Sequence, residues 1–171
     1  DVLMAKRGLT DVPLSLSPLG GGVGAVAWTM RAMRAAYEPG GPVGQLYAAN
    51  VDAKLSAGTL VRGVVLHTAS AVNAGGNGAA QNLGAVAAGQ AIRGALHVFG
   101  ITGGGTLTVK VQSDDADGFA SPIDRLAFTA LAGVPGAEWK SAAGPIADTR
   151  WRVSWTLTAG TATFAVVVGI R

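Results

Sequence analysis

Residues 113–124, SDDADGFASPID, place four carboxylates and one glycine within twelve positions. An EF-hand calcium loop requires acidic ligands at positions 1, 3 and 5, glycine at position 6 and a bidentate glutamate at position 12. Asp115, Asp117 and Gly118 fit positions 3, 5 and 6, whereas the serine and the aspartate at the two ends fit poorly. Strands, not helices, are expected on both sides. We therefore favour a tight connection in which aspartates accept nearby backbone N–H groups and Gly118 has a positive φ, with calcium binding as the alternative.

His67 and His97 are the two histidines of the chain. Two imidazoles and a distant acid could form a zinc site or supply a general base. Each histidine lies in an apolar stretch typical of a strand, and no second ligand stands at a short spacing. Histidines that are hydrogen-bonded at a strand edge or interface are therefore the favoured interpretation.

The other motifs give little support to an enzyme. Residues 20–26, GGGVGAV, resemble a dinucleotide-binding turn only loosely, because neither a preceding strand nor a following long helix is indicated, so a flexible loop is favoured. The motifs G-x-S-x-G and H-E-x-x-H do not occur. We assign no catalytic, cofactor-binding or metal-binding residue and expect no cofactor.

Tryptophan is concentrated in the last third of the chain, at Trp139, Trp151 and Trp155. Such clusters can bind sugars or stack on bases. Trp151 and Trp155 share the inward face of an alternating segment, which favours packing in the core. The outward-facing Arg150 and Arg152 could meet acids of a neighbouring subunit, or they could face solvent.

The composition favours one domain that buries surface against neighbours. The chain has 171 residues, of which 49% are hydrophobic and 13% charged, about half the usual charged share. There is no cysteine, which excludes disulfides and thiolate metal sites. The net charge is +3, and the thirteen basic residues are scattered, so no nucleic-acid footprint is indicated. No apolar run is long enough for a transmembrane helix, and the first residues lack the apolar core of a signal peptide.

Alternating apolar residues predict a mainly β chain. Residues 150–158 and 161–170 are predicted to form one hairpin, and residues 92–101 and 106–112 another. Residues 125–130 and 60–67 are further candidate strands. Short strands with glycine-rich turns favour an antiparallel β-sandwich or barrel-like fold.

The N-terminal third has a weaker pattern. Residues 10–59 contain many prolines and glycines and are interpreted as irregular chain, with one short helix at 28–37 that places Met30, Met33 and Tyr37 on one face. Residues 70–90 resemble a mobile connection. We therefore expect one domain over 1–171, with an irregular, loop-rich arm at 1–59 and a β-sandwich core at 60–171.

Residues 91–171 also resemble a known family. The stretches LHVFGITGGGTLTVKVQSDDADGFASPIDRLAFTA, DTRWRVSWT and FAVVVGI, with LVRGVVLH before them, resemble the major tail, or tail tube, proteins of long-tailed (siphovirus-type) bacteriophages. The resemblance implies a β-sandwich that assembles into six-membered rings, which stack into the conduit for DNA ejection. It also implies a place in the virion tail, assembly in the cytoplasm of the host bacterium, and contacts with other tail and head proteins.

Two further functions remain open at this point. The first is a capsid decoration (cement) protein or a head–tail joining protein of a tailed phage. The second is a carbohydrate- or receptor-binding module of the tail tip, which would need exposed tryptophans.

Overall fold

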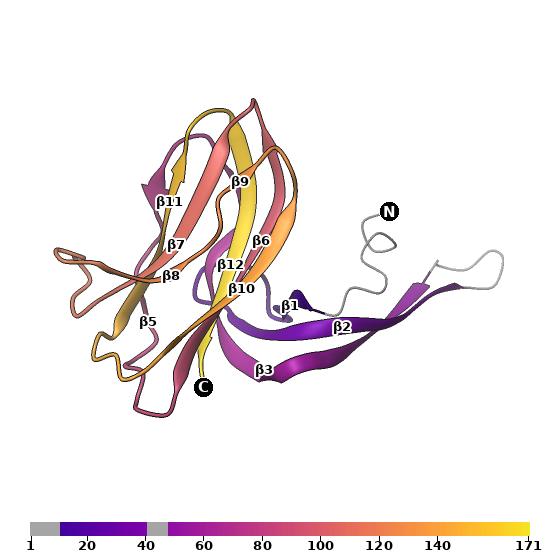
Figure 1. The fold of residues 1–171 in the computed structure, drawn as a ribbon, viewed down its shortest axis with the longest axis horizontal. Helices are drawn as coiled ribbons and strands as arrows, with labels where there is room; N and C mark the ends of the chain where they lie inside the picture. The colour runs from indigo at the N-terminus through magenta and orange to yellow at the C-terminus, as the bar shows by residue number, and fades with distance from the viewer. Residues whose placement is uncertain (1–10, 41–47) are drawn as a thin grey trace.

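The computed structural model describes residues 11–40 and 48–171, with the backbone alone at 34–40, 48–53 and 57. Two antiparallel sheets pack face to face as a β-sandwich (Figure 1). Sheet A has six strands in the order β1 (Val12–Leu16), β2 (Val26–Gly40), β3 (Ala48–Val72), β12 (Thr161–Ile170), β6 (Ala91–Thr102) and β10 (Gly136–Ala143). Sheet B has the order β4 (Gly76–Asn77), β11 (Arg150–Leu157), β7 (Thr106–Asp114) and β8 (Ile123–Ala127), with β5 (Gln81–Asn82) paired to β11 and β9 (Leu131–Ala132) paired to β7.

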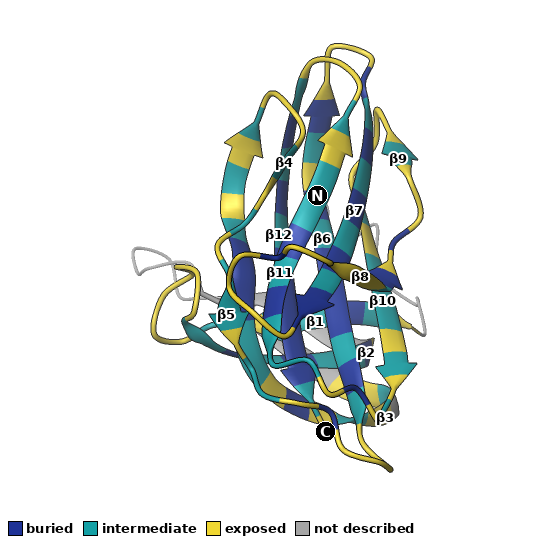
Figure 2. Cartoon of the chain, turned by 90° about the vertical axis from the view of Figure 1, so that its left-hand side faces the viewer, coloured by how far each residue is buried: buried dark blue, intermediate teal, exposed yellow. Residues whose placement is uncertain are grey.

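The core lies between the two sheets. Alternate residues of the central strands are buried, and Figure 2 shows these positions along β6, β7, β11 and β12. The largest fully buried side chains are Trp151 of sheet B and Phe164 of sheet A. Burying a side chain of this size contributes about 1.5–3 kcal/mol, so this interface dominates the stability of the fold.

The antiparallel β-sandwich expected from the sequence is confirmed. Sheet A also curls, so that its first strand, β1, approaches β6 and β10 at the opposite side of the sheet. Small side chains fill the concave face inside this curl, where Ala27, Val65 and Val167 form a second buried cluster. The sheet is therefore a half-barrel whose convex face carries the main core.

Both predicted hairpins are wrong, although their strands are present. β11 pairs with β7, whereas β12 pairs with β3 and β6. The glycines at 103–105 and at 160 therefore connect the two sheets and do not close hairpins within one sheet. An alternating pattern fixes the buried face of a strand, and that face points to the same core whichever sheet holds the strand.

The predicted helix at 28–37 is also wrong, because these residues belong to β2. Most of the stretch at 10–59 that was expected to be irregular forms β1, β2 and the first part of β3. The connection at 70–90 contains the two short strands β4 and β5. Over residues 11–40 and 48–171 the chain has no helix, so none there could span a membrane.

Two boundaries also differ from the prediction. The strand expected at 125–130 is β8, at Ile123–Ala127, and the strand expected at 60–67 is the middle of the longer β3. In addition, β10 was not predicted.

Candidate functional site

The outer part of the β2–β3 hairpin extends away from the sandwich (Figure 1). The pairing of β3 with β12 begins at Val64, and the pairing of β2 with β1 ends at Ala32. Beyond these points, residues 33–40 and 48–57, here called the arm, pair chiefly with each other. A two-stranded hairpin is marginally stable in water by itself. The arm therefore depends on its root in sheet A or on contact with another surface.

The arm exposes an apolar side chain on each of its faces. Met33 is 40% exposed and Leu55 is 47% exposed. Met33 lies opposite Lys54 and Leu55 lies opposite Ala32, so the two apolar side chains point to opposite faces of the ribbon. Each face of the arm thus offers one apolar side chain to a neighbouring surface.

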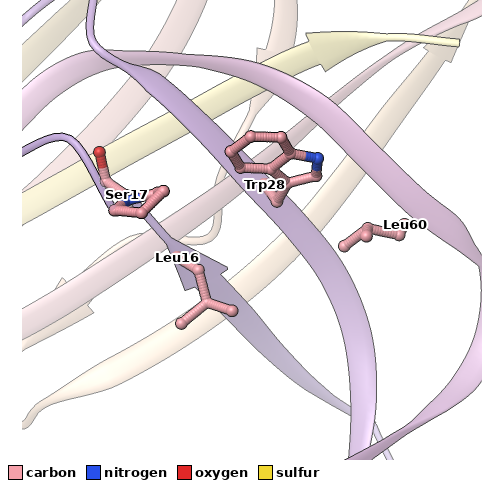
Figure 3. A pocket seen from close by; sticks show the side chains of 5 residues that line it. Leu16, Ser17, Trp28 and Leu60 are labelled. Atoms are coloured by element: carbon pink, nitrogen blue, oxygen red, sulfur yellow. The ribbon is translucent and has the colours of Figure 1, made fainter.

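An apolar hollow of about 440 Å³ lies at the base of the arm. Leu16 of β1, Trp28 of β2 and Leu60 of β3 line it, and Figure 3 shows their side chains around the opening. Leu16 is 57% exposed and Leu60 is 41% exposed. We call the arm together with Leu16, Trp28 and Leu60 the assembly surface.

Polar contacts hold the root of the arm. The Arg31 guanidinium donates to Asp11, and this hydrogen bond holds the pKa of the Asp11 carboxyl below its ordinary value. The Ser56 hydroxyl donates to the same carboxylate at 3.2 Å. On the concave face, the hydroxyls of Ser15 and Thr29 are 2.9 Å apart. These contacts fix β1 against β2 and β3 where the arm leaves the sheet.

The acidic stretch at 113–124 connects β7 to β8. Asp114 is buried and accepts the backbone N–H groups of Ser121 at 3.0 Å and Ala116 at 3.3 Å, and the Ser121 hydrogen bond is the main cause that lowers the pKa of Asp114. The positive φ belongs to Phe119, at 47°, and not to Gly118 as predicted. Phe119 is buried beneath the Arg152 guanidinium, 4.2 Å from its ring centre. Tertiary packing therefore outweighs the local preference for glycine.

Cations or backbone groups hold three of the four carboxylates of this connection. Asp115 instead shares a hydrogen bond with the Asp114 carboxyl, which is the main cause that raises the pKa of Asp115. Asp117 pairs with Arg150 at 3.1 Å, and Asp124 pairs with Lys110 at 2.6 Å. Within the part of the chain that the structure describes, no three potential metal ligands come together. The connection therefore has the geometry of a turn held by aspartates.

The two histidines lie on opposite faces of sheet A. His67 contacts the Phe164 carbonyl oxygen through Nδ1 at 3.1 Å, and its ring stacks on the Phe164 ring with a centroid distance of 4.1 Å. His97 Nε2 is 2.9 Å from the Ser15 hydroxyl, across the concave face. The structure does not bring the two rings together. Burial is the main cause that lowers the pKa of both imidazoles.

We expect acidification to destabilise the protein through these histidines. A pKa lowered by folding means that the unfolded state binds protons more strongly, so stability falls as pH falls below the ordinary histidine value of about 6.5. Urea unfolding between about pH 8 and pH 5 measures this slope before most carboxylates titrate. The double variant His67→Phe/His97→Gln should have a flatter profile. An equally steep profile in the variant would show that other groups cause the effect.

The tryptophans divide into packed and open ones. Trp151 is fully buried, and its indole N–H donates to the Gly84 carbonyl at 3.0 Å. Trp155 is half-buried against His67 and Phe164 and donates to the Ala74 carbonyl at 2.9 Å. The inward direction predicted for this pair is confirmed. Trp28 and Trp139 are also half-buried, but they line surface hollows.

Glycines 20–24 lie in the turn between β1 and β2. No long helix follows this turn, so the structural context of a dinucleotide-binding loop is missing. The assembly surface could not be recognised from the sequence, because its exposed leucines are of the same residue type as core leucines.

Comparison with known proteins assigns no family. No family model and no curated protein matches the sequence. A chain of infectious bursal disease virus, strain Gx, is similar in structure with 11% identity and a TM-score of 0.40, over 93% of this chain and 50% of that one. The CBM22-1–GH10 modules of Clostridium thermocellum xylanase 10B, complexed with xylohexaose, align with 11% identity and a TM-score of 0.33, over 96% of this chain and 25% of that one.

Empty particles of cowpea mosaic virus provide a third similar chain, with 11% identity and a TM-score of 0.31, over 94% of this chain and 86% of that one. The chain thus spans half or less of the first two proteins. Because all three TM-scores are below 0.5, we draw no conclusion about function from these similarities.

Proposed function

We propose that this chain is a virion structural protein, the tail tube subunit of a long-tailed bacteriophage, whose stacked rings form the conduit for DNA ejection. The arm is the observation that carries the proposal. It extends from a well-packed sandwich, pairs chiefly with itself, and exposes Met33 and Leu55 on opposite faces. A projecting two-stranded ribbon with exposed apolar side chains gains stability when a neighbouring subunit covers it. The resemblance of residues 91–171 to tail tube proteins supports the same role.

The charge distribution suits a passage for DNA. Unpaired lysines and arginines bind phosphates and would slow a moving nucleic acid. Five cations of the described chain lie in ion pairs: Arg31–Asp11, Lys110–Asp124, Arg125–Asp148, Lys140–Glu138 and Arg150–Asp117. Lys54, Arg62, Arg93, Arg152 and Arg171 lie outside these ion pairs, and the net charge of the chain is only +3. The proposed role is mechanical and needs no catalytic residue.

Sedimentation velocity over a concentration series tests this function. A tail tube subunit should form ring-sized oligomers of about six chains, and larger species as concentration rises. The competing function is a capsid decoration or head–tail joining protein. A monomer or trimer that binds emptied phage capsids and never grows further would contradict the tube and support that alternative.

A further inference from the structure

A polar groove runs along the free edge of β10, where the curl of sheet A brings β1 near it. Its volume is about 470 Å³. Six of its lining residues carry groups that can bind a ligand: Asp11, Arg31, Glu138, Trp139, Lys140 and Ser141. The groove lies beside the root of the arm, and the assembly proposed above does not use Trp139, Lys140 or Ser141.

Trp139 supplies a partly open aromatic surface in this groove. It pairs with Ala95 across β10 and β6, so both side chains lie on the same face of sheet A. The neighbouring Gly94 faces the sandwich core, since a Cβ placed there would lie 2.7 Å from the Leu126 side chain. Trp139 therefore faces the concave side. No described side chain or backbone group accepts its indole N–H, in contrast to Trp151 and Trp155.

The charges of the groove are balanced. Asp11 pairs with Arg31 on one side. Glu138 pairs with Lys140 at 2.8 Å on the other; these two lie opposite Leu96 and Gly94, so they start from the other face of β10 than Trp139 and line the groove at the free edge of the strand. The formal charge of the four groups sums to zero. A phosphate would face two carboxylates, and a metal cation would face two basic groups, so the groove favours neither.

Hydrogen-bonding capacity remains in both pairs. Arg31 uses two N–H groups on Asp11, which leaves three of its five donors. Lys140 can offer two further N–H donors after its contact with Glu138. The Asp11 carboxylate already accepts twice from Arg31 and once from Ser56. The Glu138 carboxylate accepts from Lys140 and from the N–H and hydroxyl of Thr129, so each carboxylate keeps about one of its four lone-pair sites. Donor and acceptor thus stand side by side twice along the groove.

We propose that this groove binds a neutral carbohydrate. A sugar hydroxyl both donates and accepts, which matches a carboxylate beside a guanidinium or an ammonium group. The C–H face of a pyranose ring is apolar and flat enough to lie on an indole ring, whose N–H then reaches a hydroxyl. An open groove with one aromatic ring and a few placed polar groups is a suitable shape for one or two sugar units of a longer chain.

Affinity gel electrophoresis of the full chain tests the proposal with six soluble polymers: hydroxyethylcellulose, xylan, laminarin, starch, galactomannan and, as the anionic control, polygalacturonate. At least one neutral polymer should retard the protein. Trp139→Ala should weaken that binding at least about tenfold, and Trp139→Phe should keep part of it because a ring remains. Phe99→Ala is the control, since Phe99 is an exposed aromatic residue outside both the groove and the assembly surface. Circular dichroism confirms that each variant is folded.

A second variant avoids dependence on the ring alone. Lys140→Met keeps most of the side-chain volume and should also weaken binding, with no change in the sedimentation behaviour. No retardation by any neutral polymer would overturn the proposal. Binding only to polygalacturonate, or equal loss in Phe99→Ala and Trp139→Ala, would overturn it as well. Assembly is measured separately, so failure here leaves the tail tube proposal intact.

Discussion

The double variant Met33→Glu/Leu55→Glu is expected to remain a folded subunit and to lose assembly. Both side chains are exposed, at 40% and 47%, so the free subunit accommodates the charges in water. In an assembled ring, each carboxylate would be covered by a neighbouring chain, and burial of an unpaired charge is strongly unfavourable. We expect the concentration needed for oligomers to rise at least about tenfold, since tenfold corresponds to about 1.4 kcal/mol. Sedimentation velocity of both proteins at matched concentrations measures the change.

A second double variant supplies the control for the arm. Ile123 and Val134 are exposed apolar residues of the sandwich, at 48% and 56%. Ile123→Glu/Val134→Glu adds the same charge away from the arm and should change assembly much less. Loss of assembly in both double variants would contradict a specific role for the arm. Normal assembly of the arm variant would remove the main support for the proposed function.

Gly160→Ala is expected to cause a large loss of folding stability. Gly160 has φ of 74°, where a residue with a Cβ is strained by about 1–2 kcal/mol. A Cβ at this position would also overlap the Thr102 carbonyl oxygen and lie 2.9 Å from the Gly103 Cα. These contacts are backbone atoms of the β6–β7 connection, which cannot move without disturbing both sheets. We expect a loss of at least about 4 kcal/mol, a large share of the stability of a domain of this size.

Gly100→Ala is the matched control for this variant. Gly100 lies in β6, has no positive φ, and a Cβ there would meet no atom within 4 Å. Urea unfolding followed by tryptophan fluorescence should place this variant within about 1 kcal/mol of the parent protein. A similarly small loss of stability for Gly160→Ala would contradict this prediction. It would show that the β6–β7 and β11–β12 connections can move apart at little cost in free energy.

The buried faces of the central strands could be predicted from the sequence. Leu107, Val109 and Val111 alternate with polar residues, and all three are buried in the core as expected. The same holds for Trp151 and Val153. A period of two residues is a direct consequence of strand geometry. The buried face of a strand can therefore be predicted without knowing which strands pair with it.

The pairing of those strands could not be predicted. The glycines at 103–105 and at 160 allow a tight hairpin as readily as a connection between two sheets. The choice depends on the packing of the two connections against each other, where Gly103 and Gly160 come into backbone contact. That contact joins residues far apart in the sequence, so local pattern carries no sign of it.

The strands of the arm and of the sheet edge were missed for another reason. Met30, Met33 and Tyr37 have helical spacing by coincidence, whereas β2 is extended because β1 and β3 pair with it. In β10, Trp139 is the one large apolar residue, because an edge strand buries little of its surface. The candidate surfaces therefore depend on tertiary placement, and the resemblance of residues 91–171 was the only signal of function in the sequence.

Negative-stain electron microscopy of the purified protein across a concentration series tests the central claim most directly. The tail tube proposal predicts rings with a central hole, and stacked tubes as concentration rises. Small separate particles at every concentration would contradict it and would favour a capsid decoration or head–tail joining protein.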